Sequence, residues 1–387
     1  MSKYGEILNK ITQGKKRCIL LSDVNNTLNL SSCDTGLEVL LLIDGLGHQF
    51  LDEISRRYPV FAKFTPIQSK GPALSHFPTT TVTNLTSLAT GLLPGVHGML
   101  GYMVRVPNSG TPERMLNGLK WDERVDPVIW QKNPTLFERG EKANIRSLHI
   151  AAKRYEGSGF TRAALRGGEY FGSNRNSEIA EIASRENKIS LLKKRPTFTY
   201  LYINHVDAAG HEDGVYSEKW WSGVGSAAEL INNLINSLPT GTRLWLTADH
   251  GMVNSTDKII LGENNPLMED VALVGGEPRA RHLYLFPDGH SSDGKTLDER
   301  VMNSKNKFSH FLEDNALIYT REELIASGLL GAVSTENSLR IGDLVIVPDN
   351  TLVLLDPSRA KKEGEMVGHH GGLTLVEREI PMMFTIV

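Results

Sequence analysis

Pairs of carboxylate and imidazole side chains stand directly after apolar runs at several points of this 387-residue chain. The segment Tyr200–Asp213 begins with such a run and continues with Asp207 and His211, four residues apart. The run has the composition of a buried strand, and residues just beyond the C-terminal end of a parallel strand line the ligand crevice of an α/β sheet. A carboxylate and an imidazole there suit a divalent cation. A single pair has an ordinary alternative, because Asp often forms turns and an isolated His is more often structural.

Three further segments present the same residue types at corresponding positions. They place Asp44 after residues 38–43, Asp249 and His250 after residues 243–248, and His369 and His370 between glycines near the C-terminus. Chance supplies one or two such ends, but hardly four of matching chemistry. Together with Asp207 and His211, and counting one histidine of the last pair, the four segments offer three carboxylates and three imidazoles. That set is enough for two divalent ions, of which zinc is the best match and manganese the next.

A hydroxyl nucleophile is available in the segment Ser75–Gly98. Small and apolar residues closed by Gly91 predict a short helix over residues 82–90, with Thr81 at or next to its N-terminus. The ordinary role of a Thr there is to cap the helix. The same geometry directs free N–H groups and a positive dipole end at an anion, so the hydroxyl could instead attack phosphorus. Two metals about 3.5–4 Å apart would clamp the attacking and leaving oxygens of such an in-line displacement.

Composition narrows the protein class. Hydrophobic residues make up 40% and charged residues 22% of the chain, and the net charge of −3 provides no basic surface for nucleic acid. The two cysteines, Cys18 and Cys33, are too few for a disulfide framework or a thiolate metal site. No secretory signal core and no run of about 18 apolar residues is recognisable. We therefore expect a cytoplasmic protein with no nucleic-acid or membrane partner, and the oligomeric state stays open.

The elements that must position these residues predict an α/β fold. We expect a mostly parallel central sheet with helices on both faces and a smaller cap built from insertions. The metal-binding catalytic core would comprise residues 1–100, 134–260 and 365–387, and the inserted cap or lid segments residues 101–133 and 261–364. Residues 1–36 are expected to form a helix and a loop, and the residues around Asp207 a loop to which Gly210 gives backbone freedom. Further expected helices cover residues 48–58, 134–140, 177–192, 217–237 and 292–312, and further strands residues 145–151, 281–286, 339–347 and 380–387.

Several motifs resemble a known family. They are Leu-Leu-Ile-Asp44-Gly, Pro78-Thr-Thr-Thr81, Thr90-Gly-Leu-Leu-Pro-Gly-Val-His97-Gly, Asp207-Ala-Ala-Gly-His211, Thr247-Ala-Asp249-His250-Gly-Met and His370-Gly-Gly. In this order they resemble the alkaline phosphatase superfamily, and within it most closely the type I phosphodiesterase/nucleotide pyrophosphatase branch. The match covers residues 37–260 and about the last 20 residues.

The resemblance implies a role for each matching residue. Thr81 would be the nucleophile that forms a covalent phospho-threonine. One zinc ion would be held by Asp207, His211 and His370, and a second by Asp44, Asp249, His250 and the Thr81 oxygen. His370 is preferred to His369 because the family pattern has His directly before Gly.

Two departures from the family pattern bear on the substrate. Nucleotide pyrophosphatases usually follow the nucleophile with Phe-Pro-Asn, where this chain has Val82-Thr83-Asn84. They also carry a phosphate-binding Asn where this chain has Tyr102, a bulkier residue that can still donate one hydrogen bond. Candidate substrate-binding residues are Tyr102, Phe77 and Asn84, with core packing the more ordinary role for Phe77.

The leading functional hypothesis is a two-metal hydrolase of phosphodiester or pyrophosphate bonds in small molecules. Within the same superfamily, the alternatives are a phosphonate hydrolase, a phosphomonoesterase or a phosphomutase. An alternative of another class is a catalytically dead binding protein on this fold. The complete set of acids and histidines favours an enzyme, since loss of any one ligand would be the usual mark of decay.

Overall fold

The computed structural model of the protein describes residues 35–67, 72–110, 113–288 and 294–387. The helix expected near the N-terminus and both cysteines lie outside these residues. Among the described helices, none combines the length and the apolar character that crossing a membrane requires.

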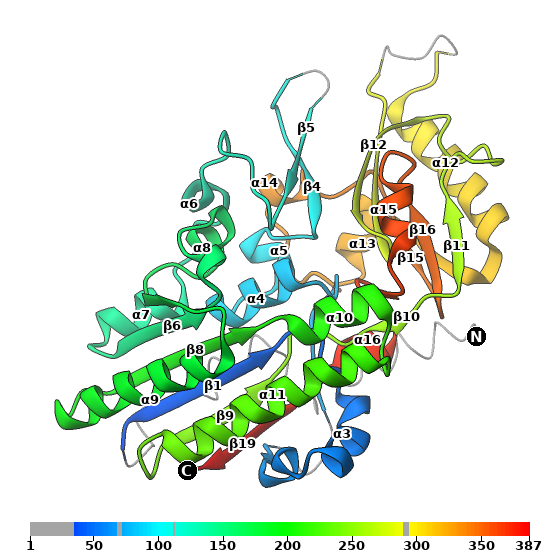
Figure 1. The fold of residues 1–387 in the computed structure, drawn as a ribbon. Helices are drawn as coiled ribbons and strands as arrows, with labels where there is room; N and C mark the ends of the chain where they lie inside the picture. The colour runs from blue at the N-terminus through cyan, green and yellow to red at the C-terminus, as the bar shows by residue number, and fades with distance from the viewer. Residues whose placement is uncertain (1–34, 68–71, 111–112, 289–293) are drawn as a thin grey trace.

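A seven-stranded sheet runs through the larger part of the molecule in the order β2, β19, β9, β1, β8, β6, β7 (Figure 1). Its strands are β1 (Leu37–Ile43), β2 (Thr65–Pro66), β6 (Arg146–Ala151), β7 (Glu169–Gly172), β8 (Thr197–Ile203), β9 (Arg243–Thr247) and β19 (Met382–Ile386). All pairings are parallel except those of β19, which runs antiparallel to β9 and β2. Ile43 of β1 is in register with Ile203 of β8, and Leu42 with Thr247 of β9. The chain therefore leaves all three strands at the same edge of the sheet.

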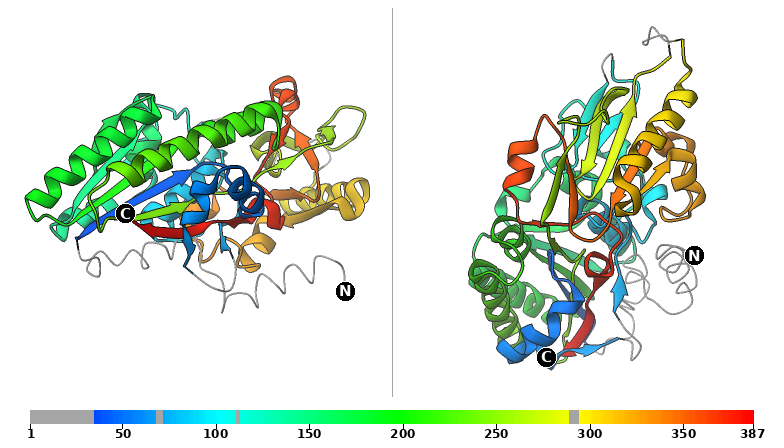
Figure 2. Two further views of the ribbon diagram at one scale, coloured as in Figure 1. Left: turned by 60° about the horizontal axis from the view of Figure 1, so that its bottom comes forward. Right: turned by 90° about the vertical axis from the view of Figure 1, so that its right-hand side faces the viewer.

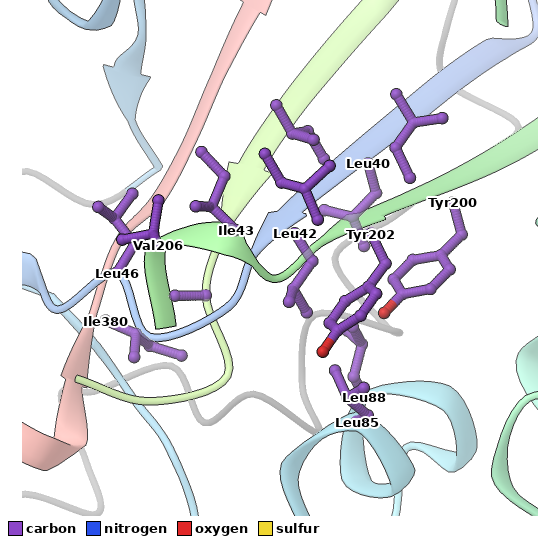
Figure 3. Close-up of a cluster of buried hydrophobic side chains, with 14 of the residues drawn as sticks. Leu40, Leu42, Ile43, Leu46, Leu85, Leu88, Tyr200, Tyr202, Val206 and Ile380 are labelled. Atoms are coloured by element: carbon purple, nitrogen blue, oxygen red, sulfur yellow. The ribbon is translucent and has the colours of Figure 1, made fainter. Parts of the chain in front are cut away.

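Helices cover both faces of this sheet, as expected. On one face α9 (Asn176–Leu192) and α11 (Glu218–Ser237) lie side by side (Figures 1 and 2). On the other face lie α4 (Thr81–Thr90) and α7 (Leu136–Lys142). Tyr200 and Tyr202 extend from β8 toward Leu85 and Leu88 of α4 (Figure 3). The continuous apolar runs of the central strands are thus buried between two helical layers.

A smaller antiparallel sheet lies beyond the C-terminal ends of the central strands (Figure 1). Its order is β12 (Val271–Glu277), β13 (Ala280–Leu285), β15 (Leu344–Pro348), β14 (Ala316–Thr320), and α12 (Leu297–Leu312) packs on it around a separate apolar cluster. Strands β4 (Met103–Val106) and β5 (Arg114–Asn117) pair antiparallel, and we call this pair the β4–β5 hairpin. The expected strand over 339–347 begins only at Leu344, and sequence reasoning did not anticipate β12 and β14.

The expected loop around Asp207 is wrong, because α10 (His205–Asp213) begins almost directly after β8. A helical turn brings Asp207 and His211 onto one face. Gly210 is needed for close packing instead of backbone freedom, since a Cβ atom there would lie 2.5 Å from the Met252 sulfur.

The remaining elements are short. The helices are α3 (Leu51–Arg57), α5 (Pro94–His97), α6 (Pro127–Trp130), α8 (Gly159–Ala164), α13 (Arg321–Ala326), α14 (Thr335–Ser338), α15 (Ala360–Glu365) and α16 (Leu375–Arg378). The strands are β3 (Ala73–Leu74), β10 (Val253–Asn254), β11 (Asp257–Ile260), β16 (Leu352–Leu355), β17 (Gly368–His369) and β18 (Glu379–Ile380).

Candidate metal centre

Asp44, Asp249 and His250 lie together where the chain leaves β1 and β9, beside Thr81. The Nε2 atom of His250 is 3.4 Å from Oδ1 of Asp44, 3.5 Å from Oδ2 of Asp249 and 3.3 Å from Oγ1 of Thr81. The Nδ1 atom of His250 is 3.0 Å from the carbonyl oxygen of Gly251. A carbonyl oxygen only accepts hydrogen bonds, so Nδ1 carries the hydrogen and the Nε2 lone pair faces the two carboxylates.

Asp207, His211 and His370 form an adjoining group. The Nε2 atom of His211 is 3.4 Å from Oδ1 of Asp207 and 3.2 Å from Nε2 of His370. The Nδ1 atoms of the two histidines are each 2.8 Å from a carbonyl oxygen, that of Gly368 for His211 and that of Thr79 for His370. By the same reasoning both Nδ1 atoms carry hydrogens, so in the neutral rings both Nε2 atoms present lone pairs toward each other.

These arrangements fit bound cations. Each of the three acids has a buried oxygen without a hydrogen-bond partner among the described residues: Oδ1 of Asp44, Oδ1 of Asp207 and Oδ2 of Asp249. Lone pairs that face one another are repulsive, and a positive ion between them supplies the missing partner. The two groups also touch, since the His250 and His370 rings stack with centroids 3.6 Å apart. The donor set of carboxylate oxygens and imidazole nitrogens is that of zinc.

The pKa values of Asp44, Asp249 and His370 are shifted because these groups are buried close to other acids and histidines. Burial raises the pKa of Asp44 well above its ordinary value, and the neighbouring Asp249 and Asp207 raise it further. Burial also raises the pKa of Asp249. Burial lowers the pKa of His370 well below its ordinary value, with His250 and His211 adding to the effect. His370 is therefore neutral, as a metal ligand must be, and a cation near the acids would favour their charged form.

Thr81 is the first residue of α4, and its side chain is 6% exposed. The N-cap position belongs to Thr80. The ordinary explanation for Thr81, that it caps the helix, is therefore wrong, and its hydroxyl is left facing His250.

His369 points elsewhere than His370. Its Nδ1 atom is 2.8 Å from Oγ of Ser255, and its Nε2 atom is 3.2 Å from the carbonyl oxygen of Glu363. Both ring nitrogens are thus engaged in a structural contact. His370, and not His369, thus lies in the group with Asp207 and His211, and its role as a ligand stays a prediction.

Residues 39–373 match the model of the type I phosphodiesterase/nucleotide pyrophosphatase family. The chain belongs to this family. It is a distant member of a family of phosphodiester and pyrophosphate hydrolases.

Its similarity to individual relatives is low. An uncharacterized pyrophosphatase/phosphodiesterase of Schizosaccharomyces pombe is 24% identical over 76% of this chain and 60% of its own length. Human ectonucleotide pyrophosphatase/phosphodiesterase family member 1 is 24% identical over 77% of this chain and 33% of its own length. This family member thus spans less than two thirds of either relative. Murine ectonucleotide pyrophosphatase/phosphodiesterase 5 has the same fold, with a TM-score of 0.68 at 16% identity, covering 90% of this chain and 88% of that one.

Two of the candidate substrate-binding residues have roles in holding the protein's own structure together. Phe77 is 1% exposed and belongs to the main apolar core. Asn84 is fully buried; its Oδ1 accepts the N–H of His76, and its Nδ2 donates to the carbonyl oxygens of His76, Pro78 and Thr80. Asn84 therefore fixes the loop that leads to Thr81, and we do not retain it or Phe77 as substrate contacts. Tyr102 is half-buried, and its backbone N–H donates to Oε2 of Glu277 in β12.

Asn84→Ala is expected to destabilise the protein by about 3 kcal/mol, because it leaves several buried backbone groups without partners. Urea unfolding measures this loss. The matched control is Asn117→Ala, since Oδ1 of Asn117 accepts N–H groups only from the exposed Leu119 and Lys120. We expect less than about 1 kcal/mol there. Equal losses for the two variants would contradict the structural role of Asn84.

Sequence reasoning missed Tyr202 and a cavity. The Tyr202 hydroxyl donates to Oδ2 of Asp44, so this side chain orients a candidate ligand. Next to it, a cavity of about 110 Å³ is lined at one end by Asp44, Thr81 and Asp207. The alternation of Tyr200 and Tyr202 along β8 places both rings on one face of the sheet, and this was the available signal.

Proposed function

We propose that this chain is a two-metal hydrolase of phosphodiester or pyrophosphate bonds in small molecules, with Thr81 as its nucleophile. The observation that carries the proposal is that unpaired carboxylate oxygens and imidazole nitrogens gather in two adjoining groups, one of which reaches the Thr81 hydroxyl through Nε2 of His250 at 3.3 Å. Membership in the phosphodiesterase/pyrophosphatase family supports the same class of reaction.

Each group of ligands would hold one ion. Zinc is the best match for both ions, and manganese is the next. The first ion would be held by Asp207, His211 and His370, and the second by Asp44, Asp249, His250 and Oγ1 of Thr81. When bound, the ions would activate the threonine oxygen and stabilise the leaving oxygen.

The residues of the chain then have defined tasks. Oγ1 of Thr81 forms a bond to phosphorus while the bond from phosphorus to the leaving oxygen breaks, which yields a phospho-threonine. Water then hydrolyses this ester and restores the hydroxyl. The position of Thr81 in the first turn of α4 places backbone N–H groups and the positive end of the helix near the phosphoryl oxygens. Asn84 keeps the preceding loop, and so the attacking oxygen, in place.

We further propose that the smaller sheet and the β4–β5 hairpin form a cap that influences substrate choice, with the boundaries expected from sequence. Tyr102, which precedes the hairpin, is tied to β12 through Glu277. It is the remaining candidate for a substrate contact from this part of the chain.

The decisive experiment compares purified, zinc-loaded protein on three substrates: bis(4-nitrophenyl) phosphate, 4-nitrophenyl phosphate and phosphonoacetate. We expect the diester to be hydrolysed fastest, with activity lost on chelation and restored by zinc or manganese. Preference for the monoester or the phosphonate would favour a phosphomonoesterase or a phosphonate hydrolase instead. Two bound zinc ions without turnover of any of the three would favour a binding protein.

A further inference from the structure

The cavity beside Thr81 reaches from Asp44 and Asp207 to residues of β6 and α8. The apolar and aromatic part of its wall is formed by Leu85, Leu119, Tyr155, Phe160, Leu165 and Tyr202. One water needs roughly 10–15 Å³ of such space, so a volume of about 110 Å³ accommodates on the order of ten non-hydrogen atoms. A compact organic group attached to a phosphate at Thr81 would enter this space.

Most polar side chains around the cavity already have partners within the protein. Oγ of Ser158 donates to Oγ1 of Thr161, and Oγ1 of Thr161 donates to the carbonyl oxygen of Tyr155. The Tyr155 hydroxyl accepts a hydrogen bond from Arg154, and the Tyr202 hydroxyl donates to Asp44. Ser158, Thr161 and Tyr202 thus hold the wall in shape, whereas the Tyr155 hydroxyl and the Asn204 amide, whose Oδ1 accepts from Arg154, can still donate to a ligand.

His149 differs, because its ring makes no hydrogen bond to another described residue. It lies on β6, lines the cavity and is only 2% exposed; its Nδ1 atom is enclosed without a partner, so a ligand would reach the ring through Nε2. Aromatic rings surround it: Phe137 stacks on it at a centroid distance of 5.9 Å, and Tyr170 and Tyr200 meet it edge-on at 4.6 and 5.1 Å. The Tyr200 hydroxyl also lacks a partner in this part of the structure, so it does not satisfy the imidazole.

A buried imidazole without hydrogen bonds calls for an explanation, because its polar atoms have left water without gaining a partner. Burial lowers the pKa of His149 to about 3, so the ring is neutral and offers one donor and one acceptor. A ligand group that hydrogen-bonds to the ring would supply such a partner. An apolar group of the same size would leave the ring unsatisfied, which is how such sites discriminate between similar ligands.

We propose that His149 is a specificity-determining residue that hydrogen-bonds a polar group on an ester substituent of the substrate seated in this cavity. The inference rests on the proposed function and adds the substrate class. The substrates are phosphodiesters in which one substituent is compact, largely apolar or aromatic, and carries a hydrogen-bonding group such as a hydroxyl. When the substrate is bound, that group would occupy the position beside the imidazole at which the protein supplies no hydrogen-bond partner.

The test uses the zinc-loaded protein and 4-nitrophenyl phosphodiesters in which the second substituent is phenyl or 3- or 4-hydroxyphenyl. The leaving group is constant, so the ratio of kcat/KM values between a hydroxyphenyl and the phenyl ester reports recognition of the hydroxyl. We expect at least one isomer to be favoured about ten-fold, which corresponds to about 1.4 kcal/mol. In His149→Phe, which keeps an aromatic ring against Phe137, this ratio should fall to about one.

The matched control is His282→Phe. His282 is a buried histidine of β13 whose Nδ1 atom accepts the N–H of Gly342, and it does not line the cavity. Its substitution should leave the preference unchanged. Binding of phenyl- and hydroxyphenylphosphonates, measured by calorimetry, should show the same preference and the same loss in His149→Phe without any turnover.

Two outcomes would overturn the inference: no hydroxyphenyl isomer is favoured by the unaltered protein, or the preference survives in His149→Phe. Failure of the proposed function looks different. In that case bis(4-nitrophenyl) phosphate is not hydrolysed at all, while the calorimetric comparison still decides whether His149 recognises the hydroxyl.

Discussion

Thr81→Ala is expected to reduce phosphodiester hydrolysis by at least about a thousand-fold, because it removes the oxygen that attacks phosphorus. Fold and metal content should stay near normal, since the three imidazoles and three carboxylates are untouched. Steady-state rates on bis(4-nitrophenyl) phosphate, combined with elemental analysis of zinc, check both statements. Thr81→Ser keeps an oxygen at this position and should retain a measurable fraction of the activity.

The matched control for this variant is Thr86→Ala in the same helix. Oγ1 of Thr86 donates to the carbonyl oxygen of Val82 one turn earlier and does not face the candidate ligands. Its loss should leave the rate nearly unchanged. Hydrolysis by Thr81→Ala at the rate of Thr86→Ala would refute the role of Thr81 as nucleophile.

The central sheet could be anticipated because its strands carry a strong and simple signal. Residues 39–43 and 200–203 are continuous apolar or aromatic runs, and the strands to which they belong are buried between two helical layers. Amphipathic patterns likewise predicted α9 and α11 to within a residue or so of their observed ends. Parallel strands then place the following residues at one edge, which is why Asp44, Asp207 and Asp249 could be expected to meet.

The sequence was less informative where tertiary contacts decide the local structure. The polar segment after β8 suggested a loop, but α10 forms there and packs closely against Met252 through Gly210. Strand β14 was missed because it is short and partly exposed, and β12 because it is partly exposed and ends in Gly275, Gly276 and Glu277. Strand β12 pairs with β13, which follows it directly in the chain, whereas β14 pairs with β15 only after α13 and α14 intervene, and no local pattern reports that second pairing.

The candidate ligands were easier to predict than the substrate contacts, for a physical reason. Acids and histidines are costly to bury, so their repeated appearance at strand ends already indicates a common partner. A residue beside the nucleophile has no such signature. Asn84 could equally bind substrate or backbone, and only its hydrogen bonds to the His76–Thr80 loop distinguish these roles. His149 lies within a buried strand, where nothing in the sequence shows that Nδ1 lacks a partner.

Replacing the candidate ligands one at a time should show whether His370 or its neighbour His369 binds a metal ion. His370→Ala is expected to lower the zinc content from about two ions to about one per chain, because it removes one of three protein ligands of a single ion. Asp207→Ala should do the same for the same ion. Elemental analysis after dialysis against metal-free buffer measures the content, and hydrolysis should be lost in parallel.

His369→Ala is the matched control, because it removes a buried histidine one residue away that contacts Ser255 and Glu363. It should keep about two zinc ions while losing about 1–2 kcal/mol of stability from those contacts. The opposite pattern, metal lost in His369→Ala and kept in His370→Ala, would show that the ligand within the pair was chosen wrongly. If all three variants keep about two zinc ions, these acids and imidazoles do not hold the bound cations. The proposed chemistry, which depends on that binding, would then be refuted.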